Sequence, residues 1–144
     1  MQIASLKRLN ERKLAAFLFA AMTFVSTLTN AQQEWYEVAS TDETFWEVQG
    51  GSFEEVRTKG GDPIAVVVSR ATTRATKRID LRKSYVPLAS CEKKMGKVVT
   101  LDLDGKFRYE NDFVVGGGTV ASAIAEFICD IYAIRVKALE KKGI

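Results

Sequence analysis

Hydrophobic and polar residues alternate along the chain from about residue 35, in the pattern of short β-strands. Two alternating runs, residues 35–39 and 44–49, come before a Gly50-Gly51 turn, and residues 52–56 form a third short run. Residues 64–69 are instead continuously apolar and rich in β-branched side chains, which is typical of a strand covered on both faces. This run is the predicted centre of a sheet.

Residues 76–90 are predicted to form a long strand with a cationic outer face, and Pro87 marks an irregularity or an edge. Its apolar residues are predicted to face the core: Ile79, Leu81, Tyr85 and Val86. Its basic residues are predicted to point outward: Lys77, Arg78, Arg82 and Lys83.

Residues 97–103 and 106–113 flank Asp104-Gly105, which fits the two central positions of a type I′ hairpin turn. The alternation places six apolar residues on one face of this hairpin: Val99, Leu101, Leu103, Phe107, Tyr109 and Phe113.

The period of the pattern changes after the glycines at 116–118. Thr119 is a suitable N-cap, and apolar residues then recur at helical spacing: Val120, Ile124, Phe127, Ile128, Ile131 and Ile134. An amphipathic helix must bury its apolar face, so we expect it to lie on the sheet. The predicted fold is α+β, with about six antiparallel strands and one C-terminal helix.

The first residues have the pattern of a secretory signal peptide rather than of a folded element. Four basic side chains lie between residues 7 and 13, residues 14–25 are apolar apart from Thr23, and residues 29–31 supply a site for cleavage. The apolar run is shorter than the roughly 20 residues that span a membrane. We therefore expect a signal peptide at 1–31 and an exported domain at 32–144 that starts near Gln32 and has no membrane span. No cysteine lies at the junction, so a lipid anchor through Cys is not expected.

The formal charge of +3 belongs to the predicted signal peptide, because residues 1–31 carry four bases and one acid. The remaining 113 residues hold 17 basic and 17 acidic side chains, with acids concentrated in residues 34–62 and bases in 63–97. A neutral total is unusual for a nucleic-acid binder, so the basic segment favours an acidic protein, a sulfated glycan or an acidic face of a protein or glycoprotein partner.

The two cysteines, Cys91 and Cys129, are expected to be bonded to each other in an exported chain. Such a bridge would close a loop of about 39 residues and join the end of the basic strand to the helix.

Catalytic and metal chemistry finds little support in the sequence. The chain has no histidine and only two cysteines, which excludes Ser-His and Cys-His nucleophile pairs and four-ligand zinc sites. The glycines at 116–118 lack the residues of a phosphate-binding loop. Acidic residues near the hairpin are those of a solvated face, and the aromatic residues between 35 and 53 favour a core over a sugar-binding platform. We predict no catalytic residue, no metal and no cofactor.

The order of these segments resembles the surface-adhesin protein E-like family of Gram-negative exported proteins. The resemblance rests on "TFWEVQGGSFEEV" at 44–56, a basic strand ending at Cys91, a hairpin, and "ASAIAEFICDIYA" at 121–133. It implies an antiparallel sheet with a disulfide-tethered C-terminal helix. It also implies binding of host matrix and plasma glycoproteins through the basic strand, here Lys77, Arg78, Arg82 and Lys83.

The predicted function is therefore an exported, non-enzymatic, adhesin-like binding protein of the periplasm, the cell surface or the medium. A periplasmic inhibitor or immunity protein that blocks an enzyme or toxin is the alternative, since a small disulfide-bonded domain suits that task equally. A solvated strand edge, protected from aggregation by Lys and Arg, is the other interpretation of the basic segment.

Overall fold

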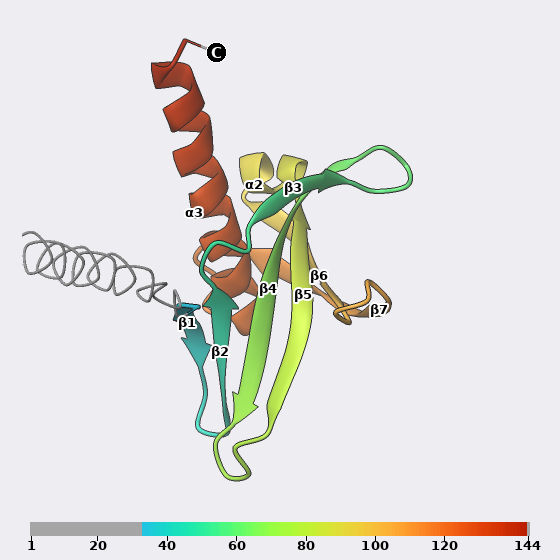
Figure 1. Cartoon of the computed structure of the whole chain (residues 1–144), viewed down its shortest axis with the longest axis vertical. Helices are drawn as coiled ribbons and strands as arrows, with labels where there is room; N and C mark the ends of the chain where they lie inside the picture. The colour runs from blue at the N-terminus through green and yellow to red at the C-terminus, as the bar shows by residue number, and fades with distance from the viewer. Residues whose placement is uncertain (1–32, 144) are drawn as a thin grey trace, which may run out of the picture. The chain divides into compact units, whose positions relative to one another are not determined.

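The structure, a computed structural model, describes residues 33–143, which form β-strands and helices (Figure 1). In chain order the elements are β1 (Trp35–Ser40), β2 (Thr44–Gln49), β3 (Glu54–Arg57), β4 (Pro63–Thr73), β5 (Ile79–Pro87), α2 (Leu88–Lys93), β6 (Met95–Leu101), β7 (Phe107–Val114) and α3 (Val120–Lys141). The predicted α+β class is confirmed. The predicted signal peptide, residues 1–31, lies outside the described residues. Among the described residues, no helix is long and apolar enough to cross a membrane.

The strands form one antiparallel sheet with the order β1-β2-β4-β5-β6-β7, and β3 also pairs with β4. β2 pairs with residues 69–73 of β4 and β3 with residues 63–66, so the two short strands follow one another along the same edge of β4. Ser52 lies in the break between them, where its hydroxyl accepts a hydrogen bond from the Val68 N–H at 3.0 Å. That bond satisfies a backbone donor that the break would otherwise leave unpaired.

The central position of β4 confirms the prediction for residues 64–69, although the strand is longer. On the face that α3 covers, β4 presents small buried side chains: Ala65, Val67, Ser69 and Ala71. The helix can approach the sheet closely there because these side chains occupy little volume.

Helix α3 begins where the sequence predicts. The Thr119 hydroxyl accepts a hydrogen bond from the Ser122 N–H at 3.0 Å, which is the N-cap interaction. Ile124, Ala125 and Ile128 enter the core, but Ile134 is 67% exposed. The predicted apolar face is therefore wrong at its C-terminal end, because the last turns of α3 extend beyond the strands (Figure 1).

The long basic strand is shorter than predicted. β5 ends at Pro87, and the residues that follow form the short helix α2, with Pro87 at its N-cap position. Proline has no backbone N–H and cannot donate to the sheet, whereas the Leu, Ala, Glu and Lys residues of α2 favour a helix. Cys91 consequently lies on α2 and not at the end of a strand.

The two faces of β5 are the reverse of the prediction. Ile79 and Leu81 are 54% and 43% exposed, whereas Arg82 and Ser84 are buried. The register with β4 decides this, since Ser84 lies opposite Val67 and the Ser84 and Ser69 hydroxyls are hydrogen-bonded at 3.0 Å inside the protein. Val86 enters the core as predicted.

The hairpin of β6 and β7 forms, but its turn and its buried face differ from the prediction. Gly105 has a φ of +92° and Asp104 is not among the positive-φ residues, so the loop of residues 103–105 is a type I turn followed by a left-handed glycine. Val98 and Thr100 are buried in addition to Val99 and Phe113. Three residues predicted to be covered are exposed: Leu103, Phe107 and Tyr109.

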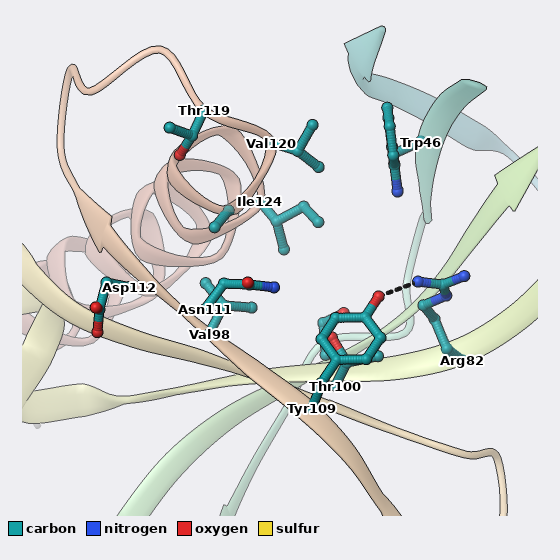
Figure 2. Close-up of a pocket in the computed structure, with 12 residues that line it drawn as sticks. Trp46, Arg82, Val98, Thr100, Tyr109, Asn111, Asp112, Thr119, Val120 and Ile124 are labelled. Carbon is teal, nitrogen blue, oxygen red and sulfur yellow. Dashed lines mark hydrogen bonds between the residues drawn. The ribbon is translucent and has the colours of Figure 1, made fainter. Parts of the chain in front are cut away.

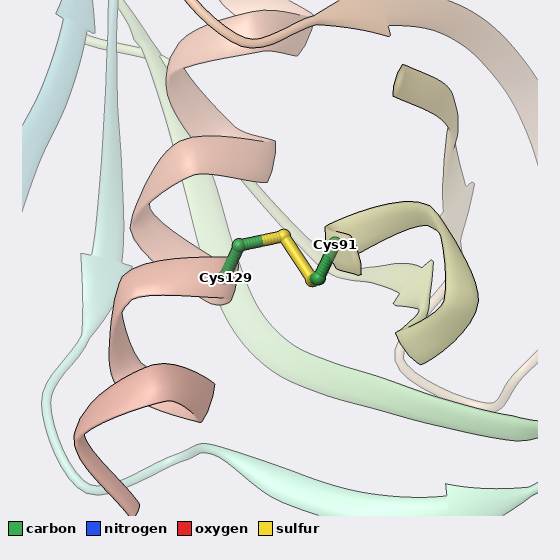
Figure 3. Close-up of a disulfide and its surroundings, with 2 residues drawn as sticks. All are labelled: Cys91 and Cys129. Atoms are coloured by element: carbon green, nitrogen blue, oxygen red, sulfur yellow. A yellow bond between two sulfur atoms is a disulfide. The ribbon is translucent and has the colours of Figure 1, made fainter. Parts of the chain in front are cut away.

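The predicted disulfide between Cys91 and Cys129 is confirmed, with a Cα–Cα distance of 5.4 Å (Figure 3). It joins α2 to the middle of α3. Because α2 directly follows β5, the bridge attaches the helix to the central strands of the sheet.

Candidate functional site

The four basic residues predicted to form one cationic surface do not lie together. Lys77 has a φ of +59° in the turn between β4 and β5, and Arg78 is exposed beside it. Arg82 is 9% exposed and faces the α3 side of the sheet, whereas Lys83, the next residue, points to the opposite face. The prediction of a continuous outward strip is therefore wrong, because neighbouring residues of a strand alternate between faces.

Two adjoining hollows lie on the α3 side of the sheet, where the helix leaves the strands uncovered. They share Trp46, Arg82 and Tyr109. The first, which we call the helix pocket, has a volume of about 370 Å³ and is lined by Trp46, Arg82, Ser84, Val98, Thr100, Tyr109, Asn111, Asp112, Thr119, Val120, Ala121 and Ile124 (Figure 2). The second, the arginine pocket, has a volume of about 460 Å³ and is lined by Thr44, Trp46, Ala71, Thr73, Arg78, Asp80, Arg82, Arg108 and Tyr109.

Arg82 lies between the two pockets. One terminal nitrogen donates to the Tyr109 hydroxyl and the other to the Asp80 carboxylate (Figure 2 shows the first of these bonds). Its Nε is buried and has no hydrogen-bond partner within residues 33–143. The buried charge is neutralised only by Asp80, which Arg108 shares, so a further anion at the terminal nitrogens of Arg82 would be favoured.

The arginine pocket has an excess of positive charge. Arg78, Arg82 and Arg108 face a single lining carboxylate, that of Asp80. Arg108 donates to both Asp80 oxygens at 3.1 Å, and its Nε lies 3.4 Å from Asp102 just outside the pocket. Arg78, in contrast, forms no ion pair with any described residue. The pocket therefore has an unneutralised guanidinium at its rim and a positive field inside it.

Hydrogen bonding by Arg108 and Arg82 fixes the charge of Asp80. Burial alone would raise the pKa of this carboxyl, but hydrogen bonds and positive charge from the two arginines outweigh burial and lower the pKa below its ordinary value. Asp80 thus stays ionised over the range in which an ordinary aspartate begins to take up a proton.

We expect Asp80→Asn to destabilise the protein by up to about 1 kcal/mol near neutral pH, because the Asp80 side chain is 38% exposed and its ion pairs are screened. A lowered folded-state pKa contributes stability above the unfolded-state pKa, and that contribution disappears as the pH falls through the folded-state value. The difference in unfolding free energy between wild type and variant should therefore shrink to zero in acid. Urea unfolding at a series of pH values measures it, and a difference that is constant down to acid pH would contradict the assignment.

The opposite face of the sheet contains a separate cationic and aromatic cluster. The Arg70 guanidinium lies 4.1 Å from the centre of the Trp35 ring, and its Nε is 2.6 Å from the Glu47 carboxylate. Trp35 is therefore occupied by a cation of its own chain. Of the aromatic residues predicted for the core, Phe53 is buried, Trp46 packs against the core from the wall of the pockets, and Tyr36 is 46% exposed.

Sequence reasoning did not identify most of the residues that line the two pockets, Asp80, Arg108 and Asn111 among them, although it placed Tyr109 on the hairpin face of Phe113. Strand alternation offered one signal, since residues 109, 111 and 113 share a face and Phe113 was predicted to be buried.

No protein-family model, curated protein or solved structure matches the chain. No three His, Cys, Asp or Glu side chains in the described part of the chain are placed to hold a metal ion.

Proposed function

We propose that this protein is an exported, non-enzymatic binding protein that holds an acidic face of a protein or glycoprotein partner in the arginine pocket. The observation that carries the proposal is the convergence of Arg78, Arg82 and Arg108 on one hollow with one lining carboxylate. An adhesin-like role agrees with the resemblance to protein E-like exported proteins, with the contact surface moved from the outward strip to the pocket.

The chemistry of the pocket suits a carboxylate or sulfate on a partner. Arginine presents a planar set of donors that binds such groups in a bidentate manner and stays charged at all physiological pH values. A concave surface with charge of one sign concentrates the electric field, which raises the rate of association with an oppositely charged surface. Trp46 and Tyr109 add flat contact area of the kind that is enriched where interfaces bind most strongly.

The test compares two double variants that change the net charge equally. Arg78→Glu with Arg108→Glu reverses two cations of the arginine pocket. Lys83→Glu with Lys141→Glu reverses one cation on the opposite face and one in the last turn of α3. Immobilised wild-type protein first captures its partner from host matrix extract and from bacterial envelope extract, and the affinity of that partner is then measured for all three proteins.

We expect the pocket variant to bind about tenfold more weakly or worse, with most of the loss in the association rate and a reduced dependence on salt. The control variant should bind like wild type. Arg78→Glu alone, at an exposed residue without an ion pair, should give part of the effect if the double variant is unstable. Equal affinities of two folded double variants would contradict the proposal. An envelope enzyme that is captured and loses its activity would instead favour the inhibitor function.

A further inference from the structure

The helix pocket has a different character from the arginine pocket. Its walls are Trp46 on one side and the first turn of α3 on the other, and its floor consists of residues from β5, β6 and β7 (Figure 2). Most of its polar groups are neutral hydrogen-bonding groups, namely hydroxyls and the amide of Asn111. Arg82 is the one cation that lines it, and the guanidinium enters from the side shared with the arginine pocket.

We infer that the helix pocket binds one carboxylate-bearing monosaccharide, either free or at the end of a glycan. This inference deepens the proposed function and rests on it in one respect, since a terminal acidic sugar would be part of the glycoprotein partner held beside it. Arg82 would bind the sugar carboxylate, and the neutral polar groups would bind the hydroxyls.

The first support is the state of Arg82. Its side chain is nine-tenths buried, its Nε has no partner within the described residues, and the one carboxylate that it contacts is shared with Arg108. The Nε itself is covered, so a ligand carboxylate would bind to the terminal nitrogens, each of which has a second N–H beyond the bond to Tyr109 or Asp80, and would give the guanidinium an anionic partner of its own. Charge-assisted hydrogen bonds of this kind are the strong ones in proteins.

The start of α3 adds to the positive potential of the pocket. Thr119, Val120 and Ala121 line it, and the Thr119 hydroxyl satisfies only the Ser122 N–H among the first amides of the helix. The first turn contains no acidic residue, so the positive end of the helix dipole is not neutralised by its own side chains. Asp112 is a carboxylate at the edge of the pocket, but its side chain is 84% exposed and paired with Lys97 at 2.9 Å.

The second support is the size and polarity of the pocket, which distinguish a sugar from an aspartate or glutamate side chain. A volume of about 370 Å³ lies within the range of small-molecule sites, and one carboxylate side chain would leave most of it unfilled. Asn111 is an exposed residue at the pocket and Thr100 lies in its floor, and neither side chain forms a hydrogen bond with another described residue. A ring with several hydroxyls can pair with both, while Trp46 offers an apolar wall to the C–H face of the ring.

The two tryptophans of the chain allow a direct test. Trp46 lines the helix pocket, whereas Trp35 lies on the opposite face under Arg70. The oxidised protein is titrated with glucuronic acid, glucose and N-acetylneuraminic acid, and the two indole N–H signals are followed by NMR after assignment with Trp35→Phe. Glucuronic acid and glucose differ only at C6, which is a carboxylate in the first and a hydroxymethyl group in the second. We expect a saturable shift of the Trp46 signal with the two acidic sugars, no shift with glucose, and no shift of the Trp35 signal.

Two variants examine the polar floor. Asn111→Ala and Thr100→Val each remove one hydrogen-bonding group, and each should weaken binding of the acidic sugars about fivefold. Arg82→Gln should abolish binding, but it also removes the contacts with Tyr109 and Asp80, so the two milder variants keep the test valid if that protein does not fold. N-acetylneuraminic acid at the end of a short oligosaccharide is compared with the free sugar, and tighter binding of the oligosaccharide identifies a glycan as the source.

Three results would overturn the inference: no shift of Trp46 with either acidic sugar, equal shifts of both tryptophans, or a glutamate-rich peptide that shifts Trp46 with the same dependence on Asn111. These outcomes are separate from those for the arginine pocket. If the acidic sugars do not bind but Arg78→Glu with Arg108→Glu releases the protein partner, only the inference fails. If the sugars bind but that variant retains its partner, only the proposed function fails.

Discussion

Replacement of both Cys91 and Cys129 by alanine should lower the free energy of unfolding by about 4 kcal/mol, because the bridge closes a loop between residues 38 positions apart. In the chain-entropy account, the bond stabilises the native state by restricting the unfolded one. For a domain of this size the loss corresponds to a decrease in melting temperature of roughly 15 °C. Calorimetry or urea unfolding of the oxidised protein and the double variant measures it.

A reductant provides the matched control. It should lower the melting temperature of the wild type toward that of the double variant, and it should leave the double variant unchanged. Alkylation of the unreduced wild type should find no free thiol. A double variant as stable as the oxidised wild type would mean that burial alone holds α3 in place.

Ile128→Ala is expected to cost about 2 to 5 kcal/mol, since Ile128 is fully buried and the substitution leaves a cavity in addition to removing apolar contact. Ile128 belongs to the cluster formed by the helix and the central strands, with Val67 and Val86 among its members. Side chains of the sheet cannot move far enough to fill the space, because hydrogen bonds hold the strands in register.

Ile134→Ala is the matched control for this prediction. It makes the same chemical change on the same helix, but at a residue that is 67% exposed, so the expected change is below about 0.5 kcal/mol. Urea unfolding of both variants gives the comparison. Similar losses at the two positions would mean that the end of α3 is packed against something in solution.

Local signals account for the parts of the fold that the sequence predicted. Thr119 and the helical spacing from Val120 to Ile131 define the start and the buried face of α3 without reference to any distant residue. The continuous apolar run from residue 64 likewise identifies the central strand. The pairing of two cysteines needed no geometry, because only one partner exists for each.

The orientation of β5 could not be obtained in the same way. Residues 79, 81 and 85 are the more apolar set, and local alternation therefore favours them for the core. The register with β4 determines the outcome instead, because it places Arg82 opposite Ser69 and Ser84 opposite Val67 on the side where α3 packs. Close approach of a helix selects small side chains, which is a property of the assembled layers and not of one strand.

The candidate site could not be predicted from the sequence for the same reason. Arg82 and Tyr109 are 27 residues apart and belong to strands separated by β6, so their contact depends on the order of strands in the sheet. Pro87, in contrast, is a local signal for the end of β5, because proline has no N–H to donate to the sheet. The length of the basic strand was therefore open to correction from the sequence, whereas the pockets were not.

The 22 residues of α3 also separate the helix pocket from the C-terminal end of the helix. A helix of that length measures about 33 Å, with the helix pocket at its first turn and Lys141 at its last. A surface, label or neighbouring domain joined after the helix would be held at the far end of this rod, and the pocket would stay open to large partners. Attachment through the C-terminal end is therefore the orientation of choice for any sensor or display format built on this protein.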